Sequence, residues 1–317
     1  MDPQCVHDFA QLDTSGPVPL DRPFTRGEAR SWGVADKHLR RYVLGGALIS
    51  PIRGVYYSTI LVDDIPLRAA CLHLVVPPDC VVTDRTAAWI LGAEQALAPN
   101  DHLVPPRVSI HRPPGYRLRN AISSGGERAL KAEDVMDVGG VRVTTPLRTA
   151  CDLGRLLHRD QAFACLDCML ALGHFSREQL VAEVERFRGY RKVRQLRELA
   201  PDADGRSGSP EESILRRRWL DCPDLPRPEP QFSVRGPQGW YAIDLAEPTA
   251  RYAVEYDGAE WHGEDRRAHD QQRREWCRRT DNWYFDVFRR EDLHGPGRLA
   301  EVRLRHGYAL AASRFAR

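Results

Sequence analysis

Three acidic residues near the end of the chain are spaced so that they could do chemistry together. Asp244 stands between the apolar residues Ile243 and Leu245, and a single residue separates Glu255 from Asp257. Side chains alternate along a β-strand, so Glu255 and Asp257 project from one face of a strand there. If the two segments pair through a short turn, the three carboxylates converge.

Converging carboxylates repel one another and lose hydration, so a fold keeps them only if something offsets their charge. A divalent cation is the natural offset, and hard oxygen ligands suit Mg²⁺ or Mn²⁺. Such an ion could hold a phosphodiester and activate water for in-line attack, with Asp244 and Glu255 as its ligands. The alternative is an edge strand whose acids merely face solvent. The apolar neighbours of Asp244 argue against it.

The acids belong to a longer pattern that resembles a nuclease family. Gly258 and His262 follow them, and Ser209, Pro210 and Glu212 precede them. The pattern resembles the domain-of-unknown-function branch of PD-(D/E)XK nucleases related to very-short-patch-repair (Vsr) endonucleases, over residues 207–295. The resemblance implies a metal-dependent DNA endonuclease or nickase with a restriction-endonuclease-like α/β domain at residues 210–317.

The resemblance also implies roles for particular side chains. The catalytic set it implies is Glu212, Asp244, Glu255, Asp257 and His262. The Lys of the generic motif is absent and Asp257 takes its place, so the water-activating role falls to His262 or to the metal alone. Two members have plainer explanations. The helix macrodipole favours an acid such as Glu212 in a first turn, and His262 could form a surface pair with Trp261.

A helix expected at residues 265–280 carries six arginines, at 266, 267, 273, 274, 278 and 279. Forked guanidinium groups grip phosphates well, so Arg273 and Arg274 are candidate DNA contacts. The alternative is a solvated charged surface.

A second basic stretch lies near the start of the chain, where residues 22–57 hold seven Lys or Arg and two acids. Thr25 and Glu28 form a capping box for a helix at residues 26–32. A second helix is expected at residues 37–44, followed by a two-stranded wing that turns at Arg53 and Gly54.

These elements predict a winged helix-turn-helix at residues 21–59, which is similar to the winged-helix module of AbiEi-family antitoxins. In such a unit the second helix enters the major groove and the wing meets the backbone or the minor groove. The expected DNA contacts are Lys37, His38, Arg40, Arg41 and Arg53. The alternative is a winged helix used for protein contacts or dimerisation.

The rest of the chain divides by composition. Residues 1–20 are an expected flexible lead-in, and residues 60–146 are a mixed α/β block that resembles the corresponding part of AbiEi-like proteins. That block shows no catalytic constellation, and Asp84 is interpreted as a helix cap. Residues 147–200 are amphipathic and predict a helical spacer. Residues 201–209 have the composition of a hinge.

Composition bounds the protein class. The chain has 317 residues, is 42% hydrophobic and 28% charged, and carries a net charge of +2. It has no apolar run of about 18 residues that could span a bilayer and no secretory signal at its start, so we expect a cytoplasmic protein without a membrane partner. The eight cysteines are expected to be reduced. Cys165 and Cys168 have the spacing of half a zinc site but fit core packing better.

The sequence therefore predicts a multidomain α+β and α/β protein. Its expected function is a metal-dependent DNA endonuclease targeted by the winged helix, with Mg²⁺ or Mn²⁺ as cofactor and double-stranded DNA as partner. The alternative is a non-catalytic DNA-binding transcriptional regulator or antitoxin-like protein, with a toxin as partner. A homodimer stays open, and an RNA-processing nuclease is disfavoured because no aromatic platform for single strands is present.

Overall fold

The computed structural model describes residues 17–96, 104–113, 123–236, 239–258, 264–295 and 299–315, without the side chains of Gln95 and of residues 264–270. The chain divides into two compact units, Met1–Leu153 and Gly154–Arg317. Within the described ranges, no helix combines the length and the apolar character that crossing a membrane requires.

The first unit begins with a small winged helix. Its elements are β1 (Phe24–Thr25), α1 (Arg26–Ser31), α2 (Asp36–Leu44), β2 (Leu48–Ile49) and β3 (Val55–Ser58), with the strand order β1-β3-β2. The two predicted helices and the predicted wing are confirmed. Strand β1, which pairs with β3, was not predicted because two residues are too few to show a period.

Local chemistry explains where these helices begin and end. The Glu28 amide donates to Thr25 Oγ1 at 3.1 Å, and the Thr25 amide donates to Glu28 Oε2 at 2.7 Å, so the predicted capping box is confirmed. Gly33, with φ of 83°, lets the chain turn into α2. The core beneath consists of Val18, Phe24, Ala29, Val34, Leu39, Leu48 and Tyr56.

A five-stranded sheet of order β6-β5-β4-β8-β7 forms the rest of the first unit. Its elements are α3 (Ile65–His73), β4 (Val81–Val82), α4 (Asp84–Ile90), η3 (Glu94–Ala96), β5 (Val108–Arg112), β6 (Ser123–Glu127), η4 (Ala132–Asp134), β7 (Val135–Val138) and β8 (Val141–Thr144). Helices α3 and α4 pack against this sheet, and Val82, Ile110 and Val143 are buried. The predicted hairpin at β7 and β8 is confirmed. Strand β6 was not predicted, because its glycines carry no side-chain pattern. Helix α5 (Pro146–Leu156) contains the boundary between the units.

The second unit joins a group of helices to a four-stranded sheet. The helical part holds α6 (Arg159–Ala171), α7 (Arg177–Glu183), η5 (Val184–Phe187), α8 (Val193–Leu199), η6 (Ala200–Asp202) and α9 (Pro210–Leu220). The sheet part holds β9 (Glu229–Gly236), β10 (Gly239–Glu247), β11 (Tyr252–Tyr256), α10 (Glu264–Asp281), β12 (Tyr284–Phe288), α11 (Arg290–His294) and α12 (Leu299–Ser313).

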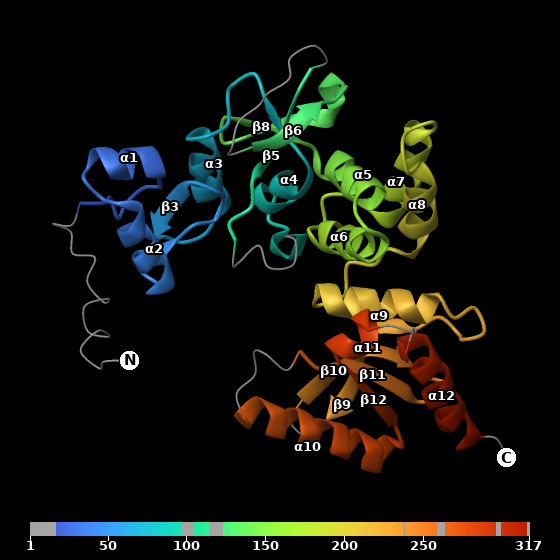
Figure 1. The fold of residues 1–317 in the computed structure, drawn as a ribbon. Helices are drawn as coiled ribbons and strands as arrows, with labels where there is room; N and C mark the ends of the chain where they lie inside the picture. The colour runs from blue at the N-terminus through green and yellow to red at the C-terminus, as the bar shows by residue number, and fades with distance from the viewer. Residues whose placement is uncertain are drawn as a thin grey trace. The chain divides into compact units, whose positions relative to one another are not determined.

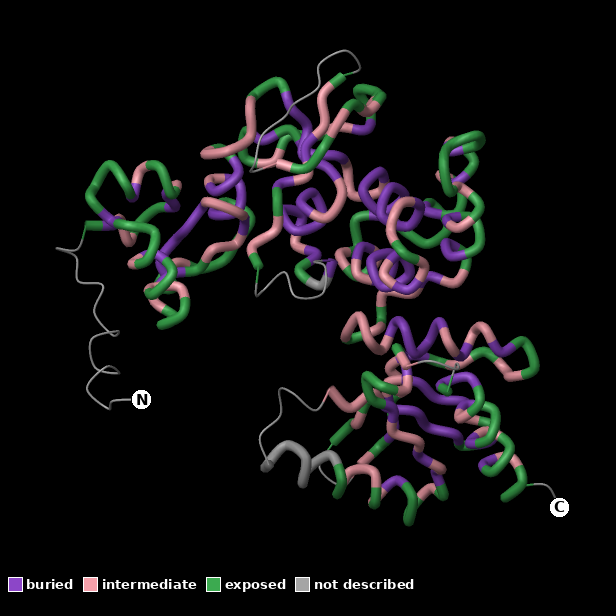
Figure 2. The backbone as a smooth tube through the Cα atoms, viewed as in Figure 1, coloured by how far each residue is buried: buried purple, intermediate pink, exposed green. Residues whose placement is uncertain are grey.

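This sheet has the order β12-β11-β10-β9, antiparallel except for the parallel pair β11 and β12. Helix α10 covers one face, and α9 and α12 cover the other (Figure 1). The strands between the helices form the buried centre of this unit (Figure 2). Each face has its own apolar core, one containing Trp219 and Tyr252 and the other Ile243 and Phe285.

Helix α9 also packs against α6, so the helical residues and the sheet share one unit. Arg216 donates from Nη2 to both carboxylate oxygens of Asp167 at 2.8 and 2.7 Å, and both side chains are buried. The amide of Asp204 donates to Asp167 Oδ1 at 2.8 Å. The sequence predicted a hinge at residues 201–209, but these bonds give a packed connection there. Cys165 lies buried within α6.

Candidate functional site

The two strands that carry the acids are neighbours, and their register brings the predicted metal ligands face to face. Leu245 on β10 lies opposite Val254 on β11. One further step along both strands places Asp244 opposite Glu255, and directly opposite residues project to the same face of a sheet. The amide of Tyr256 donates to Asp244 Oδ2 at 2.8 Å, which fixes that carboxylate against β11.

Glu212 on α9 reaches the same place. Its Oε2 accepts from Gln231 Nε2 and from the Gly208 amide, both at 2.8 Å, and its Oε1 accepts from Ser209 Oγ at 3.0 Å. Its negative charge raises the pKa of Asp244. Helix α9 therefore brings Glu212 beside the two strands, as the nuclease resemblance implied.

The pKa of Asp244 is raised to about 8, first by burial and next by the negative charge of Glu212. Glu255 raises it further, while the amide of Tyr256 and the charge of Arg273 act in the opposite direction. A carboxyl group with this pKa is largely protonated at neutral pH. The proton on Asp244 thus reduces the negative charge of the acidic cluster by one.

Two arginines of α10 neutralise Glu255. Arg273 Nη2 lies 2.8 Å from Glu255 Oε1, and Arg274 Nη1 lies 2.9 Å from Glu255 Oε2. Arg273 also donates to the carbonyl of Ala242 at 3.0 Å. Glu255 is 4% exposed, so both arginines are turned inward toward the sheet. The sequence assigned these arginines to DNA, whereas here their charges are engaged within the unit.

One of the two predicted ligands of Mg²⁺ or Mn²⁺, Glu255, is already paired with arginines. A cation would need the Glu255 oxygens that Arg273 and Arg274 hold. Across the described ranges, no group of three His, Cys, Asp or Glu side chains is placed to bind a metal ion. Asp257 forms an ion pair of its own, with its Oδ2 3.6 Å from Arg289 Nη2. His262 lies outside the described residues.

The winged helix presents a second candidate surface. Lys37, Arg40 and Arg41 are exposed on α2 and recur with Leu44 at helical spacing, so they share one face. Leu39, which is 1% exposed, anchors the opposite face in the core. No ion pair engages these three basic residues among the parts of the chain that are described. Their charges are available to a partner.

The other two predicted DNA contacts of this module are less open. His38 is half-buried on α2. Arg53 lies at the wing turn, where its amide donates to the carbonyl of Pro106 at 2.9 Å. Its side chain is half-buried beside Arg26 and Tyr56.

A buried charge cluster in the first unit was missed from the sequence. Asp84 was interpreted as a helix cap, but Thr83 occupies the cap position and Asp84, with φ of 53°, begins α4. The Asp84 carboxylate instead forms two bonds with Arg128, at 2.8 and 3.0 Å. Arg128 also contacts Asp152 at 3.1 Å, and Arg148 joins Asp152 at 2.8 Å. The cap interpretation was wrong because the partner lies 44 residues away. No local signal could have found it.

Comparison with known proteins identifies the middle of the chain. Residues 79–202 match the model of the AbiEi antitoxin C-terminal domain, so the mixed α/β block and the helices after it fall within one match. The chain is also 31% identical, over 272 residues, to the uncharacterized proteins MT2308 and Rv2248 of Mycobacterium tuberculosis, from strains CDC 1551 / Oshkosh and ATCC 25618 / H37Rv. The aligned part covers 83% of this chain and 94% of each of those proteins. The chain therefore belongs to the family of these two mycobacterial proteins and carries an AbiEi antitoxin-like domain at residues 79–202.

Proposed function

We propose that the protein is a DNA-binding regulator of the antitoxin type, which binds duplex DNA through its winged helix and does not cut it. The observation that carries the proposal is the outward face of α2, where Lys37, Arg40 and Arg41 lie exposed and unpaired within the described chain, together with the AbiEi antitoxin-like domain that follows. This function was the alternative weighed from the sequence.

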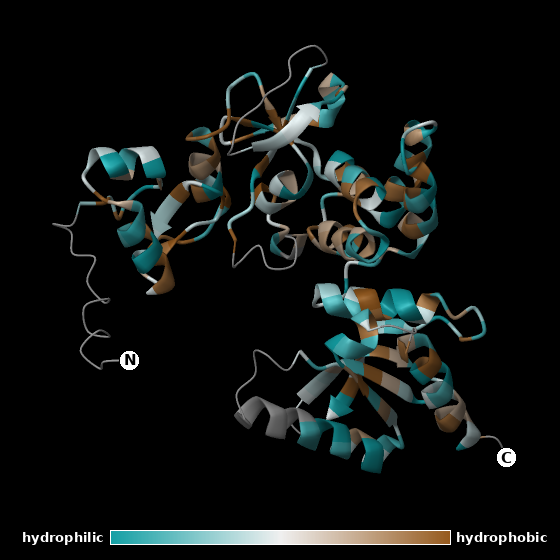
Figure 3. Cartoon of the chain, in the orientation of Figure 1, coloured by the Kyte–Doolittle hydropathy of each residue, from teal (hydrophilic) through white to brown (hydrophobic). Residues whose placement is uncertain are grey.

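The geometry of α2 suits the major groove, which is about 12 Å wide and admits one helix. The three basic side chains share the face opposite Leu39, so all of them can approach one DNA surface while the helix stays packed. Figure 3 colours the hydrophilic residues of α2 teal. Lysine and arginine contacts to phosphates supply affinity and register, and contacts to base edges supply sequence preference.

The AbiEi antitoxin-like domain gives the proposal its second partner. A domain of this kind in the same chain as a DNA-binding module implies a protein that binds a toxin as well as an operator. We therefore propose a toxin as the protein partner, bound through residues 79–202.

The test is a binding titration of the full chain against duplex DNA from the region upstream of its own gene, in a chelating buffer. The triple variant Lys37→Ala/Arg40→Ala/Arg41→Ala is expected to lose at least about tenfold in affinity, because each phosphate contact releases counterions. The slope of log affinity against log salt should become shallower by about 2 to 3.

A matched control removes three exposed arginines from the second unit: Arg177→Ala/Arg188→Ala/Arg197→Ala. This variant should bind DNA as the wild type does. Equal losses in the two triple variants would show that general basic charge, and not α2, binds DNA, and the proposal would fail.

The metal-dependent endonuclease predicted from the sequence is the second candidate, and one observation favours it. Asp244 lies opposite Glu255 on the neighbouring strand, and the charges of Glu212 and Glu255 both act on it. Against it stands the arginine pair on Glu255. Plasmid DNA incubated with Mg²⁺ or Mn²⁺ should show nicking by the wild type and none by Asp244→Ala if this function is real. If the plasmid stays intact with both proteins, the nuclease function is excluded and the regulator is the function that stands.

A further inference from the structure

The five-stranded sheet of the first unit carries a cavity on the face that α3 and α4 leave open. Its register brings one residue from each strand into a single row: Gly126, His111, Val81, Arg142 and Asp137. The cavity over this row has a volume of about 590 Å³. That size lies within the range of about 300 to 1,000 Å³ that holds small-molecule ligands.

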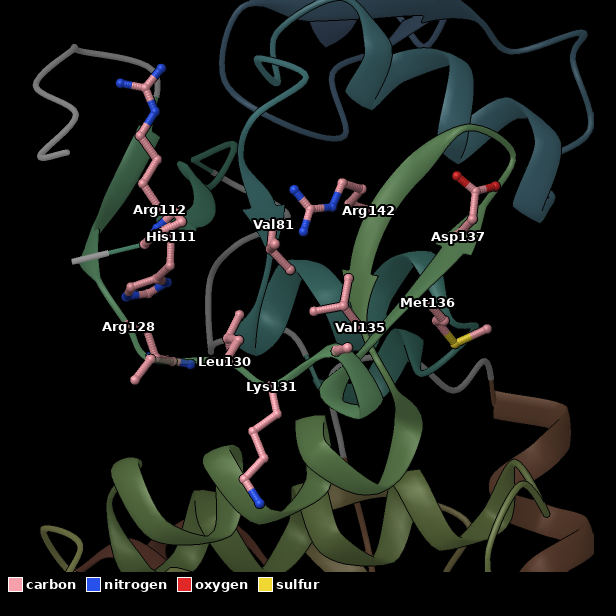
Figure 4. Close-up of a pocket in the computed structure, with 13 residues that line it drawn as sticks. Val81, His111, Arg112, Arg128, Leu130, Lys131, Val135, Met136, Asp137 and Arg142 are labelled. Atoms are coloured by element: carbon pink, nitrogen blue, oxygen red, sulfur yellow. The ribbon is translucent and has the colours of Figure 1, made fainter. Parts of the chain in front are cut away.

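The lining combines apolar and cationic side chains (Figure 4). Val81, Leu130, Val135 and Met136 supply apolar surface. The charged side chains around them are Arg112, Arg128, Lys131 and Arg142, with Asp137 as the one acid in the lining. A ligand with an apolar part and a negative part matches this combination.

The cations differ in how far their charge is already offset. Carboxylates within the first unit neutralise Arg128 and Arg112. Lys131 has a neighbour in Glu133 at 3.4 Å, but both side chains are more than 60% exposed, so that pair contributes little. Arg142 is exposed on β8 and pairs with no carboxylate among the described residues. Lys131 and Arg142 are therefore the groups that an anionic ligand would engage.

His111 adds a defined hydrogen-bonding group. Thr83 Oγ1 lies 3.0 Å from Asp84 Oδ2 and 2.8 Å from His111 Nδ1. A hydroxyl has one proton to donate, and a carboxylate can only accept it. Thr83 therefore accepts from His111 Nδ1–H, which leaves Nε2 as an acceptor in the neutral ring. Burial, and then the charge of Arg128, lower the pKa of His111, which favours this neutral form.

The loop that forms the floor of the cavity is held by buried ion pairs. Arg128 binds Asp84 and Asp152, and Arg148 links Asp152 to Asp134, at 2.8 and 2.7 Å. The backbone of Lys131 donates to Asp134 Oδ2 at 2.9 Å. A ligand thus meets groups whose positions are already fixed, which lowers the entropic cost of binding.

We infer that this cavity binds a nucleotide. The phosphates bind Arg142 and Lys131, the base packs against the apolar wall around Val81, and a base amine or ribose hydroxyl donates to His111 Nε2. A nucleotide engages the two cations, the apolar surface and the acceptor of His111 together. The site lies within the AbiEi antitoxin-like domain and is separate from α2.

The experiment titrates the full chain with ATP, GTP, adenosine and pyrophosphate by isothermal calorimetry. ATP or GTP should bind. Lys131→Ala/Arg142→Ala should lower the affinity for that nucleotide by about tenfold or more, as expected for the loss of charge-assisted bonds. His111→Ala should lower the affinity for the nucleotide and leave the affinity for pyrophosphate unchanged. Thermal unfolding of each variant verifies that it is folded.

The matched control is Arg177→Ala/Arg188→Ala, which removes two exposed charges from the second unit and should leave nucleotide affinity unchanged. Three results would overturn the inference. They are no heat with either nucleotide at millimolar concentration, equal affinity of wild type and Lys131→Ala/Arg142→Ala, and pyrophosphate binding as tight as that of the nucleotide.

Discussion

Asp244 on β10 lies directly opposite Glu255 on the neighbouring strand β11. The negative charges of the two acids are offset in two different ways. Burial and the neighbouring carboxylates raise the pKa of Asp244 to about 8, while Arg273 and Arg274 hold Glu255 at 2.8 and 2.9 Å. One acid is thus neutralised by a proton and the other by arginines. The first two predictions follow from this division.

The free energy of unfolding should depend on pH through Asp244. Its folded-state pKa of about 8 lies above the ordinary value of 3.8, so the folded protein keeps a proton that the unfolded chain releases between these values. Stability should therefore fall as pH rises from about 4 to about 8, by up to about 1.4 kcal/mol per pH unit. Asp244→Asn should flatten that slope in urea unfolding measured at several pH values. Asp224→Asn, at a carboxylate whose pKa is lowered, should leave it unchanged. An unaltered slope in Asp244→Asn would refute the raised pKa.

Removal of the arginine pair should destabilise the second unit. Arg273→Ala/Arg274→Ala leaves the carboxylate of Glu255 at 4% exposure without those two counter-charges, which costs about 3 to 5 kcal/mol of unfolding free energy. Adding Glu255→Gln should recover part of the loss, because it removes the charge that was left behind. The exposed pair Arg278→Ala/Arg279→Ala on the same helix should cost less than about 1 kcal/mol. Equal costs for the two pairs would contradict the assignment.

The ion pair between Arg216 and Asp167 should stabilise the packing of α9 on α6. Arg216→Ala leaves Asp167 buried without its main partner, and the expected cost is about 3 to 5 kcal/mol in chemical denaturation. Arg206→Ala, which breaks an exposed pair with Asp204, should cost about 0 to 1 kcal/mol. A cost of that small size for Arg216→Ala would mean that the connection at residues 201–209 behaves as the hinge predicted from the sequence.

Gly307 on α12 should tolerate no side chain. An added Cβ there would collide with Asp286 Oδ2 and Tyr252 Oη, which hydrogen-bond to each other at 2.8 Å. Alanine gains about 1 kcal/mol over glycine in a helix, but overpacking costs about 1 to 3 kcal/mol or more, so we expect a net loss in the melting temperature of Gly307→Ala. Gly27→Ala on α1, where the nearest atom is Thr25 Oγ1 at 3.7 Å, should be neutral or stabilising. Stabilisation of both variants would show that α12 can move away.

Local patterns in the sequence were sufficient for the two helices and the wing of the winged helix and for the strands that carry the acids. The capping box of Thr25 and Glu28 and the alternation around Asp244 and Glu255 involve residues a few positions apart, so their geometry is set by the backbone itself. Strand β6 was not predicted, because its glycines give no periodic hydrophobic pattern. The partners of these acids could not be predicted, since the same acids suit a metal or a set of arginines equally well.

The sequence by itself thus determined where the charged groups lie along helices and strands and which face each one takes. The tertiary structure alone decided their partners: Arg273 for Glu255, Arg216 for Asp167 and Arg128 for Asp84. These pairs join residues 18, 49 and 44 positions apart. The physical reason is that a periodic pattern fixes the direction of a side chain within its own element, whereas the charge it meets depends on how distant elements pack.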